Sequence, residues 1–188
     1  IGLFVQPAAL KVVDREGEPL LLAGEPDSLG KLAETARSTS VAVYAVADEE
    51  FRAANTHWQN LVYQIIETAD NAWYRDYGIN WVVQGYYSWT SNGGSASALL
   101  ADLASDGSGL PSGLVIGFTA DTHFTAGGIA YVYSSDPCTG FSLHLDQGLS
   151  ATIASVQHEV EHNYGCSHGD PKACAALITA SVGWFQCP

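Results

Sequence analysis

The chain has 188 residues, and 47% of them are hydrophobic, which is enough for the buried core of one domain. It carries 7 Lys and Arg residues against 20 Asp and Glu residues, and the formal charge of −13 repels nucleic-acid phosphates and anionic lipids. No apolar run reaches the length of about 18 residues that a membrane-spanning helix needs. We therefore expect no nucleic-acid partner and no membrane segment. We also expect the protein to be a monomer.

The sequence indicates an extracellular protein. It contains no Met, even at position 1, so Ile1 cannot be an initiator residue and we expect that an upstream segment has been removed. Its 4 Cys residues, an even number, predict two disulfides in an oxidising compartment. The alternative is a cytosolic protein with buried free thiols.

The first part of the chain is expected to form an extension with no visible chemistry. Residues 10–13 and 20–23 are apolar and flank a charged turn, which predicts a hairpin. Residues 25–28 then predict the cap of a short helix. We interpret residues 1–37 as an N-terminal extension that packs on a domain formed by residues 38–188.

Strand and helix patterns alternate in the rest of the chain. Alternating or β-branched stretches predict strands, and apolar residues at helical spacing predict helices. Ser150 is the expected N-cap of the last helix, and Gly165 is expected to terminate it. The order of elements predicts an α/β (α+β) fold with a mixed sheet. The expected strands are residues 40–46, 79–87, 114–119, 128–133 and 141–145, and the expected helices are residues 51–77, 96–103 and 151–164.

The segment HEVEHNYGCSH, residues 158–168, contains three of the chain's 6 His residues. His158 and His162 are four residues apart on the predicted helix, so both imidazoles project from one face and can reach one ion. Glu159 points about 100° round the helix, beside an ion and not onto it, where its carboxylate can take a proton from water at the metal. Gly165 allows the left-handed turn that brings His168 back as a third ligand.

This set of ligands is typical of a catalytic metal site. Three neutral imidazoles leave a fourth tetrahedral position open for water, as in catalytic zinc centres. A random H-E-x-x-H in a chain of this composition has a probability of roughly 1%, and the added Gly and third His lower it to roughly one in ten thousand. Two alternatives are scattered surface histidines and a structural zinc site closed by Cys166.

The same residues resemble the zinc-binding signature H-E-x-x-H-x-x-G-x-x-H of the metzincin metallopeptidases. Residues 128–132 with the following Cys138 are similar to the edge strand of the reprolysin (adamalysin-like) branch, and residues 44–89 resemble the first half of its catalytic domain. The resemblance implies a zincin-like metzincin catalytic domain, with a twisted mixed sheet, long helices and a small C-terminal subdomain after Gly165. A substrate cleft lies between the two parts of such a domain.

The resemblance also implies how a substrate binds. An edge strand would pair with the extended substrate backbone, and a pocket beside the zinc would select one side chain. The implied edge strand contains Gly128, Ile129, Ala130 and Tyr131. The implied outer wall of the pocket, residues 179–182, contains Thr179, Ala180 and Ser181. Further candidates for the cleft are Tyr131, Tyr133 and Trp184.

Two of the departures from the family pattern lie close to the expected zinc site. Metzincins carry a Met in a tight turn beneath the zinc, whereas this chain has no Met and aligns Ile178, or alternatively Leu177, with that turn. Because this Met supplies an apolar floor and does not ligate zinc, Ile178 can take its place. Glu161 replaces a small residue before the second ligand, and we interpret it as a solvent-facing or hydrogen-bonded residue.

The four cysteines allow three pairings. By the resemblance we expect Cys138 to pair with Cys187 and Cys166 to pair with Cys174. The second bridge would brace the loop that delivers His168.

Together these inferences predict a secreted zinc-dependent endopeptidase that acts on proteins or peptides, with one catalytic Zn²⁺ and Glu159 as the general base. The alternative is a catalytically impaired metzincin-like module that binds zinc and peptide, and a third hypothesis is a purely structural zinc domain. Calcium binding is compatible with the sequence but is not indicated by it. We expect His57, His123 and His144 to be surface residues or hydrogen-bonded core residues.

Overall fold

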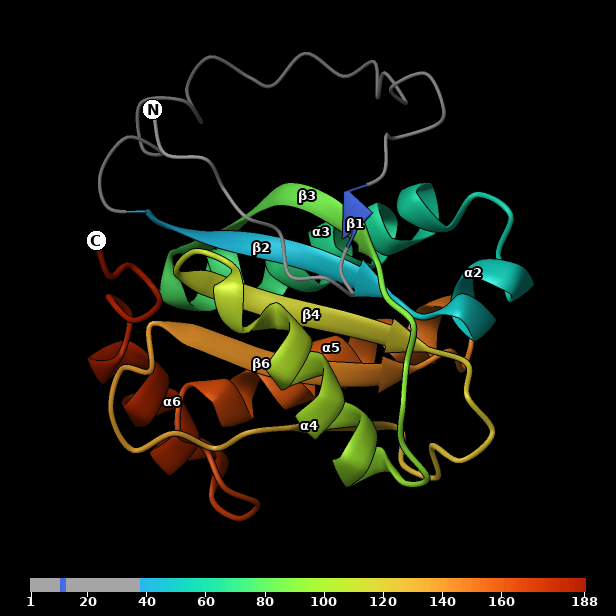
Figure 1. Cartoon of the computed structure of the whole chain (residues 1–188). Helices are drawn as coiled ribbons and strands as arrows, with labels where there is room; N and C mark the ends of the chain where they lie inside the picture. Colours follow the sequence, from blue (N-terminus) through green and yellow to red (C-terminus); the bar gives the residue numbers. More distant parts are fainter. Residues whose placement is uncertain (1–10, 13–37) are drawn as a thin grey trace.

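The computed structural model describes residues 11–12 and 38–188, and in these residues six strands form one sheet in the order β1-β3-β2-β4-β6-β5 (Figure 1). β2, β3, β4 and β6 run parallel, whereas β1 and β5 pair antiparallel with their neighbours at the two edges. This is a mixed sheet, as the sequence predicts. The strands are β1 Lys11–Val12, β2 Thr39–Ala47, β3 Ile79–Ser88, β4 Gly113–Thr119, β5 Gly128–Ala130 and β6 Thr139–Leu145.

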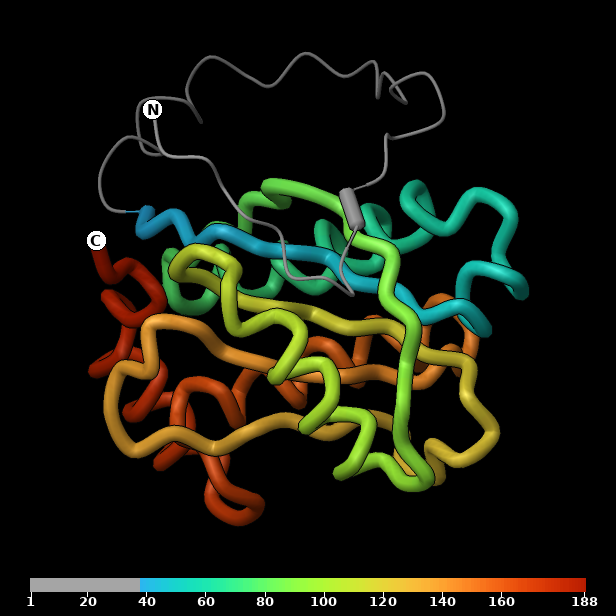
Figure 2. Tube along the Cα trace, in the orientation of Figure 1, coloured from blue at the N-terminus to red at the C-terminus, as the bar shows by residue number. Residues whose placement is uncertain are grey.

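Helices cover both faces of the sheet, so the described residues form three layers (Figures 1 and 2). α3 and α5 contact each other on one face, behind the sheet in this view, and α4 lies in front of it. α6 belongs to the C-terminal part that follows α5. The helices are α2 Glu49–Ala54, α3 Trp58–Tyr77, α4 Ala96–Asp106, α5 Leu149–Asn163 and α6 Pro171–Ala180, with a short 3-10 helix at Gly107–Gly109.

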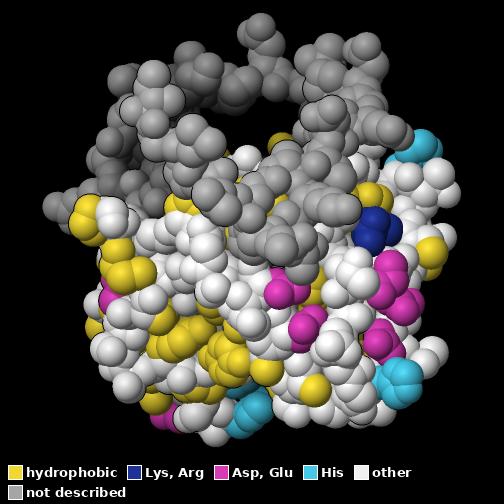
Figure 3. Space-filling view, in the orientation of Figure 1, with side chains coloured by type: hydrophobic (Ala, Val, Ile, Leu, Met, Phe, Trp, Pro, Cys, Tyr) yellow, Lys and Arg dark blue, Asp and Glu magenta, His cyan; other side chains and the backbone are white. Residues whose placement is uncertain are grey.

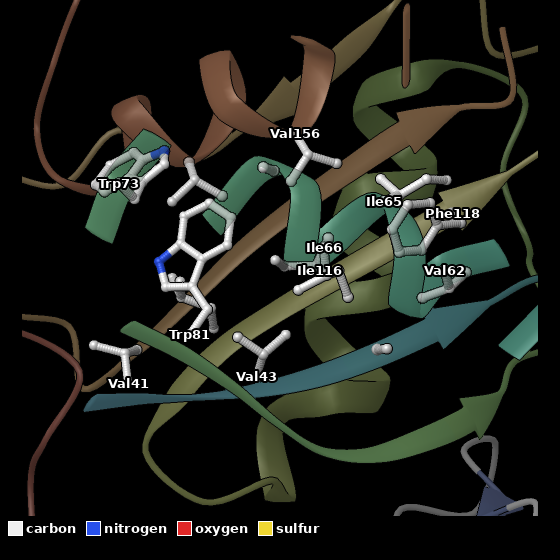
Figure 4. Close-up of a cluster of buried hydrophobic side chains, with 14 of the residues drawn as sticks. Val41, Val43, Val62, Ile65, Ile66, Trp73, Trp81, Ile116, Phe118 and Val156 are labelled. Atoms are coloured by element: carbon white, nitrogen blue, oxygen red, sulfur yellow. The ribbon is translucent and has the colours of Figure 1, made fainter. Parts of the chain in front are cut away.

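The sheet divides the core into two clusters. β4 lies in the middle with all seven residues buried, because helices cover both of its faces. On one face, Val62 and Trp73 of α3 meet Trp81 and Ile116 of the sheet (Figure 4). On the other face, α4 buries three leucines against the same strands. These contacts hold β6 and α5 in place, and α5 carries most of the histidine motif.

The single helix expected over residues 51–77 is wrong, because the structure breaks it at Asn55 into α2 and α3. Asp48 caps α2 by accepting the amide of Phe51 at 2.7 Å. Asn55 then leaves helical geometry, and its Nδ2 donates to the Phe51 carbonyl at 3.0 Å and to Asp146 Oδ2 at 2.9 Å. Such side-chain bonds compete with the helical ladder. Apolar periodicity gives no sign of them.

Two other element boundaries differ from expectation. α5 begins at Leu149 after Gly148, without a side-chain cap, so Ser150 lies inside the helix. β5 ends at Ala130, although the amide of Tyr131 still donates to the carbonyl of Phe141 in β6 at 3.2 Å. Both elements nevertheless occupy the expected parts of the chain.

The N-terminal expectations fall mostly outside the described residues. The hairpin and the short helix before residue 38 are not described, apart from Lys11 and Val12, which form β1 and pair with β3. None of the helices in the described part of the chain is long and apolar enough to cross a membrane.

Two disulfides hold the C-terminal part. Cys138–Cys187 joins the residue before β6 to the C-terminus, and Cys166–Cys174 joins the segment after α5 to α6. These are the pairs that the resemblance implies. No cysteine within the described residues is free.

Candidate active site

The histidine cluster is built at the C-terminal end of α5. His158 and His162 are four residues apart in this helix, and their ring centroids are 4.8 Å apart. The amides of Gly165 and Cys166 donate back to carbonyl oxygens of the last turn, which is the bonding pattern of a Schellman ending. This ending reverses the chain, so the following loop returns to the face that carries the two imidazoles.

The backbone conformation and the close packing at position 165 both require glycine. Its φ is 90°, in the left-handed region that favours glycine. A Cβ at this position would also lie 2.8 Å from the carbonyl oxygen of Tyr133. Glycine therefore allows both the reversal of the chain and the close approach of the segment that follows β5.

His168 completes the cluster from the loop after α5. Its Nε2 lies 3.2 Å from Nε2 of His158, and its ring centroid is 4.7 Å from that of His162. The disulfide Cys166–Cys174 closes around His168 and fixes the loop to α6. One ligand atom from each of the three histidines lies within 4.8 Å of the others.

The donor set fits a zinc ion. His162 Nδ1 lies 2.7 Å from the carbonyl oxygen of Cys166, which can only accept, so Nδ1 carries the proton and Nε2 keeps a free lone pair. A partner of this kind fixes the orientation of a ligating histidine. Burial, with the two neighbouring histidines, lowers the pKa of His158 and favours the neutral form that binds a metal. Three converging imidazole nitrogens are a typical zinc donor set.

Glu159 lies on the flank of α5 that faces β5. Its side chain is 8% exposed, and burial raises its pKa while the neighbouring His162 opposes the rise. A Cβ on Gly128 would lie 2.6 Å from Glu159 Cγ and 2.9 Å from its Oε1, so this carboxylate reaches the edge strand. Glu161 is half-buried on the side of α5 that faces α3, where burial and, after it, the charge of Glu161 raise the pKa of Tyr77.

The hydrogen bonds of β5 show which of its backbone groups face the sheet. The amide of Leu145 donates to the carbonyl of Gly127 at 3.1 Å, and the amide of Tyr131 donates to Phe141. In an antiparallel pair such bonds occur at alternate residues. Residues 127, 129 and 131 therefore bond to β6, whereas residues 128 and 130 turn their groups to the other side.

β5 is the last strand of the sheet among the described residues, so the groups that turn away from β6 face an open edge. Gly128 and Ala130 present amide and carbonyl groups there. Tyr131 has both backbone groups engaged, because its carbonyl also accepts from Asn163 Nδ2 at 2.9 Å. Of the four residues that the resemblance implies for substrate pairing, only Gly128 and Ala130 thus offer backbone bonds.

A cavity of about 610 Å³ opens between the segment after β5, the end of α5 and α6. Ala180 and Ser181 belong to its wall, whereas Thr179 does not, and the Thr179 hydroxyl donates to the carbonyl of Ala175 at 2.8 Å. The space-filling view shows hydrophobic side chains gathered low on the drawn face, with histidine side chains beside them (Figure 3). The cavity is lined by Val132, Tyr133, Ser134, Tyr164, Gly165, Leu177, Ala180, Ser181 and Trp184.

Ile178 lies in α6 and not in a tight turn. Asp170 caps this helix, Pro171 occupies its first position, and the helix continues to Ala180. The side chain of Ile178 is 0% exposed and belongs to the larger core cluster. It supplies apolar surface to the core from a helix, whereas the resemblance implies a tight turn at this position.

The other three histidines do not belong to the cluster. His57 is exposed before α3, and exposed His123 lies 2.8 Å from Asp121. His144 is buried in β6. Sequence reasoning missed two residues of α5 that bind β5, Ser155 and Asn163. Their partners are backbone carbonyls, which no residue pattern marks.

Comparison with known proteins agrees with this geometry. The model of a family described as metallo-peptidase family M12 matches residues 37–183, which include the whole histidine cluster. The chain belongs to this family. Members of family M12 are zinc peptidases, so the family implies protein or peptide substrates. The resemblance to metzincin peptidases is thereby confirmed, and so is the zincin-like fold class.

Two solved structures match parts of this M12 chain at low sequence identity. A chain from the "Structure of a chaperone-substrate complex" has a TM-score of 0.57 at 14% identity, over 71% of this chain and 27% of that chain. Metalloproteinase-II from Bacteroides fragilis has a TM-score of 0.46 at 14% identity, over 80% of this chain and 49% of that one. The first likeness shows a shared fold alone, and the second is too low to support an inference. This chain spans less than half of either protein, and no curated protein matches it.

Proposed function

We propose that this M12 peptidase is a secreted, zinc-dependent endopeptidase that hydrolyses peptide bonds within proteins and peptides. The observation that carries the proposal is the convergence of three imidazoles beside a buried glutamate. His158, His162 and His168 would hold one zinc ion, which supplies Lewis-acid chemistry at the scissile carbonyl when bound. The carbonyl of Cys166 orients His162 for this role.

Glu159 is the proposed general base and acid. Its carboxylate lies between the histidine cluster and Gly128, where a substrate backbone would pass. It would take a proton from the attacking water and return it to the leaving amine nitrogen. Because the side chain is buried against the edge strand, its position is fixed before substrate arrives.

An extended substrate would add to the open edge of β5. Gly128 and Ala130 would exchange backbone hydrogen bonds with it, so most substrate side chains would be tolerated. One side chain beside the scissile bond would enter the cavity between α5 and α6. Leu177 and Trp184 in its lining favour an apolar or aromatic side chain there.

The test of this mechanism is a matched pair of substitutions on α5. Glu159→Gln keeps the size of the side chain and should retain zinc and the fold. It should lower kcat/KM on an unfolded protein substrate by about 100-fold or more, since general acid–base groups contribute roughly 10²–10⁴-fold. Glu161→Gln, two residues further along the helix, should keep the wild-type rate. Mass spectrometry of chelator-sensitive products measures the rate, and metal analysis measures zinc content. Unchanged turnover by Glu159→Gln would overturn the assignment of the base.

One observation favours a second candidate function. The chain has no Met, and Ile178 lies in a helix where metzincins have a turn. The second candidate is a module that binds zinc and an extended peptide without cleaving it. A folded, zinc-loaded sample that binds peptide but releases no products would establish this function in place of the first.

The proposal also includes secretion and the residue range of the catalytic domain. Two disulfides support secretion, because such bonds persist in oxidising compartments. Residues 38–188 would form the catalytic domain, with residues 1–37 as an extension, and the protein would act as a monomer. Gel filtration and activity of the chain with and without the extension test these points.

A further inference from the structure

Three side chains form a row along α5 on the flank that faces β5. Ser155, Glu159 and Asn163 are spaced by four residues each, so they lie on one side of the helix, about one turn apart. The first and last members bind backbone carbonyls at the two ends of the edge strand. Glu159, the proposed general base, lies between them.

Ser155 holds the first end of the strand. Its Oγ donates to the carbonyl of Gly127 at 3.0 Å, so it accepts from His144 Nδ1, which lies 3.0 Å away. His144 Nε2 then accepts from the Ser142 hydroxyl at 3.0 Å. Burial lowers the pKa of His144 to about 3, which keeps the ring neutral and this order of donors in place. A chain of hydrogen bonds thus runs from the interior of β6 through α5 to the strand.

Asn163 holds the other end. Its Nδ2 donates to the carbonyl of Tyr131 at 2.9 Å and to that of Phe141 at 3.0 Å. The side chain is 0% exposed, so water does not compete for these bonds. Asn163 directly follows His162, and the attachment of the strand is therefore one residue from the histidine cluster.

The distance between the two attachment points is nearly the same along β5 and along α5. Four residues of strand, from residue 127 to residue 131, span about 13 Å, and eight residues of helix, from Ser155 to Asn163, span about 12 Å. Gly128 fits between them because it has no side chain. A Cβ there would overlap the Ser155 hydroxyl and lie 2.6 Å from Glu159 Cγ.

We infer that Ser155 and Asn163 are positioning residues that fix the register of an extended substrate against Glu159. The inference rests on the proposed endopeptidase function. A substrate strand pairs with Gly128 and Ala130, so the position of β5 along α5 decides which peptide bond meets the carboxylate. A slip of one residue would turn each pairing group away from its partner. Neither positioning residue touches the substrate, and both act through β5.

A kinetic test separates this role from general stability. A set of peptides of one sequence is N-methylated at each backbone amide in turn, and kcat and KM are measured for each. With wild-type protein, methylation of a pairing amide should lower kcat/KM about three- to ten-fold, the value of one hydrogen bond. In Ser155→Ala, kcat/KM for the unmodified peptide should be lower than in the wild type by a similar factor. Methylation of the pairing amide should then lower kcat/KM of this variant little further, because the effects of changing two coupled groups are not additive.

Two further variants control this experiment. Ser150→Ala changes an exposed serine of the same helix and should reproduce every wild-type value. Ser155→Thr keeps a hydroxyl and should restore the sensitivity to methylation. Additive losses in Ser155→Ala would overturn the positioning role.

Hydrogen exchange of the zinc-free protein gives a readout that needs no activity. The amides of residues 129 and 131, which face β6, should exchange faster in Ser155→Ala and in Asn163→Ala than in the wild type, while those of β4 keep their protection. Unchanged exchange at β5 in both variants would overturn the inference and leave the proposed function intact. Absence of chelator-sensitive hydrolysis by the wild type would instead overturn the proposed function. Faster exchange would then still support the attachment of β5 by the row.

Discussion

Asp70 is a buried carboxylate on the face of α3 that meets the sheet. It is 6% exposed, and its Oδ1 accepts the backbone amide of Trp81 in β3 at 2.8 Å. Burial raises the pKa of Asp70 from 3.8 to about 6, and the bond from Trp81 opposes only part of this rise. Folding therefore favours the protonated form of this residue.

This shift predicts that ionised Asp70 costs stability at neutral pH. Its pKa is higher in the folded than in the unfolded protein, so between about pH 4 and pH 6 the folded protein binds more protons. The free energy of unfolding consequently falls as the pH rises through this window. Asp70→Asn keeps an oxygen acceptor for Trp81 and removes the ionisation. In urea titrations, its free energy of unfolding should fall less than that of the wild type as the pH rises.

Other buried groups titrate in or near the same pH range. The free energy of unfolding of the variant is therefore compared with that of the wild type at each pH. Burial also raises the pKa of Asp48 to about 6, while His144, with its lowered pKa, acts in the opposite direction. Asp76→Asn is the matched control, because Asp76 is exposed on the same helix and Arg75 lowers its pKa. This control should not flatten the profile. Equal slopes for Asp70→Asn and the wild type would contradict the prediction.

Among the larger elements, the two disulfides hold different parts of the fold. Cys166–Cys174 spans a separation of 8 residues around His168, and Cys138–Cys187 spans a separation of 49 residues. A longer closed loop removes more entropy from the unfolded chain, so the longer bridge should contribute about 4 kcal/mol and the shorter about 2.5 kcal/mol. The longer loop contains all three histidines of the cluster, but only the shorter bridge adjoins them, because Cys166 lies two residues before His168 and its carbonyl oxygen bonds to His162.

Removal of the shorter bridge should therefore mainly lower zinc affinity, and removal of the longer bridge should mainly lower stability. Replacing Cys166 and Cys174 by Ser should weaken zinc binding about 10- to 100-fold, as loss of groups that orient metal ligands does. Replacing Cys138 and Cys187 by Ser should cost more unfolding free energy and leave zinc affinity unchanged. Competition with a chromophoric chelator measures affinity, and urea unfolding measures stability. Equal losses of zinc affinity in the two double variants would contradict this assignment.

The histidine cluster could be predicted because it is local. Its three histidines lie within eleven residues, and one helix with one glycine turn brings them together. The break at Asn55 could not be predicted, because it depends on Asp146, 91 residues along the chain. The apolar spacing that predicts one long helix is present on both sides of the break.

The row of side chains on α5 could be predicted only in part. The spacing of Ser155, Glu159 and Asn163 is visible in the sequence, but their contacts with β5 require the sheet to be assembled. The same holds for β5 itself. Alternation predicts a strand to residue 133, whereas the bond from Asn163 to Tyr131 and the approach of Tyr133 to Gly165 end it at Ala130.

For the molecule as a whole, the core is built without the histidine cluster. Apolar side chains of the sheet and its helices form the two core clusters, and of the three histidines only His162 is buried. We therefore expect the zinc-free protein to remain folded. Zinc should stabilise it by mass action alone, by about 2.7 kcal/mol when free zinc is 100 times its dissociation constant.

Circular dichroism with and without a chelator measures this expectation. The far-ultraviolet spectrum should be unchanged by chelation, and the thermal midpoint Tm should fall and recover when zinc is restored. The variant with Cys138 and Cys187 replaced by Ser serves as the reference for a folded but less stable protein. Loss of the far-ultraviolet signal on chelation would contradict the expectation and favour a purely structural zinc.

The open edge of β5 has a consequence for the targets of such an enzyme. An edge that offers only amides and carbonyls can dock a chain only where that chain's own amides and carbonyls are free. A helix or an inner strand of a folded target has none to spare. Selection would therefore follow the conformational freedom of the target. The same stretch of sequence would be cut in a loose tail or a damaged protein and left intact once it had folded.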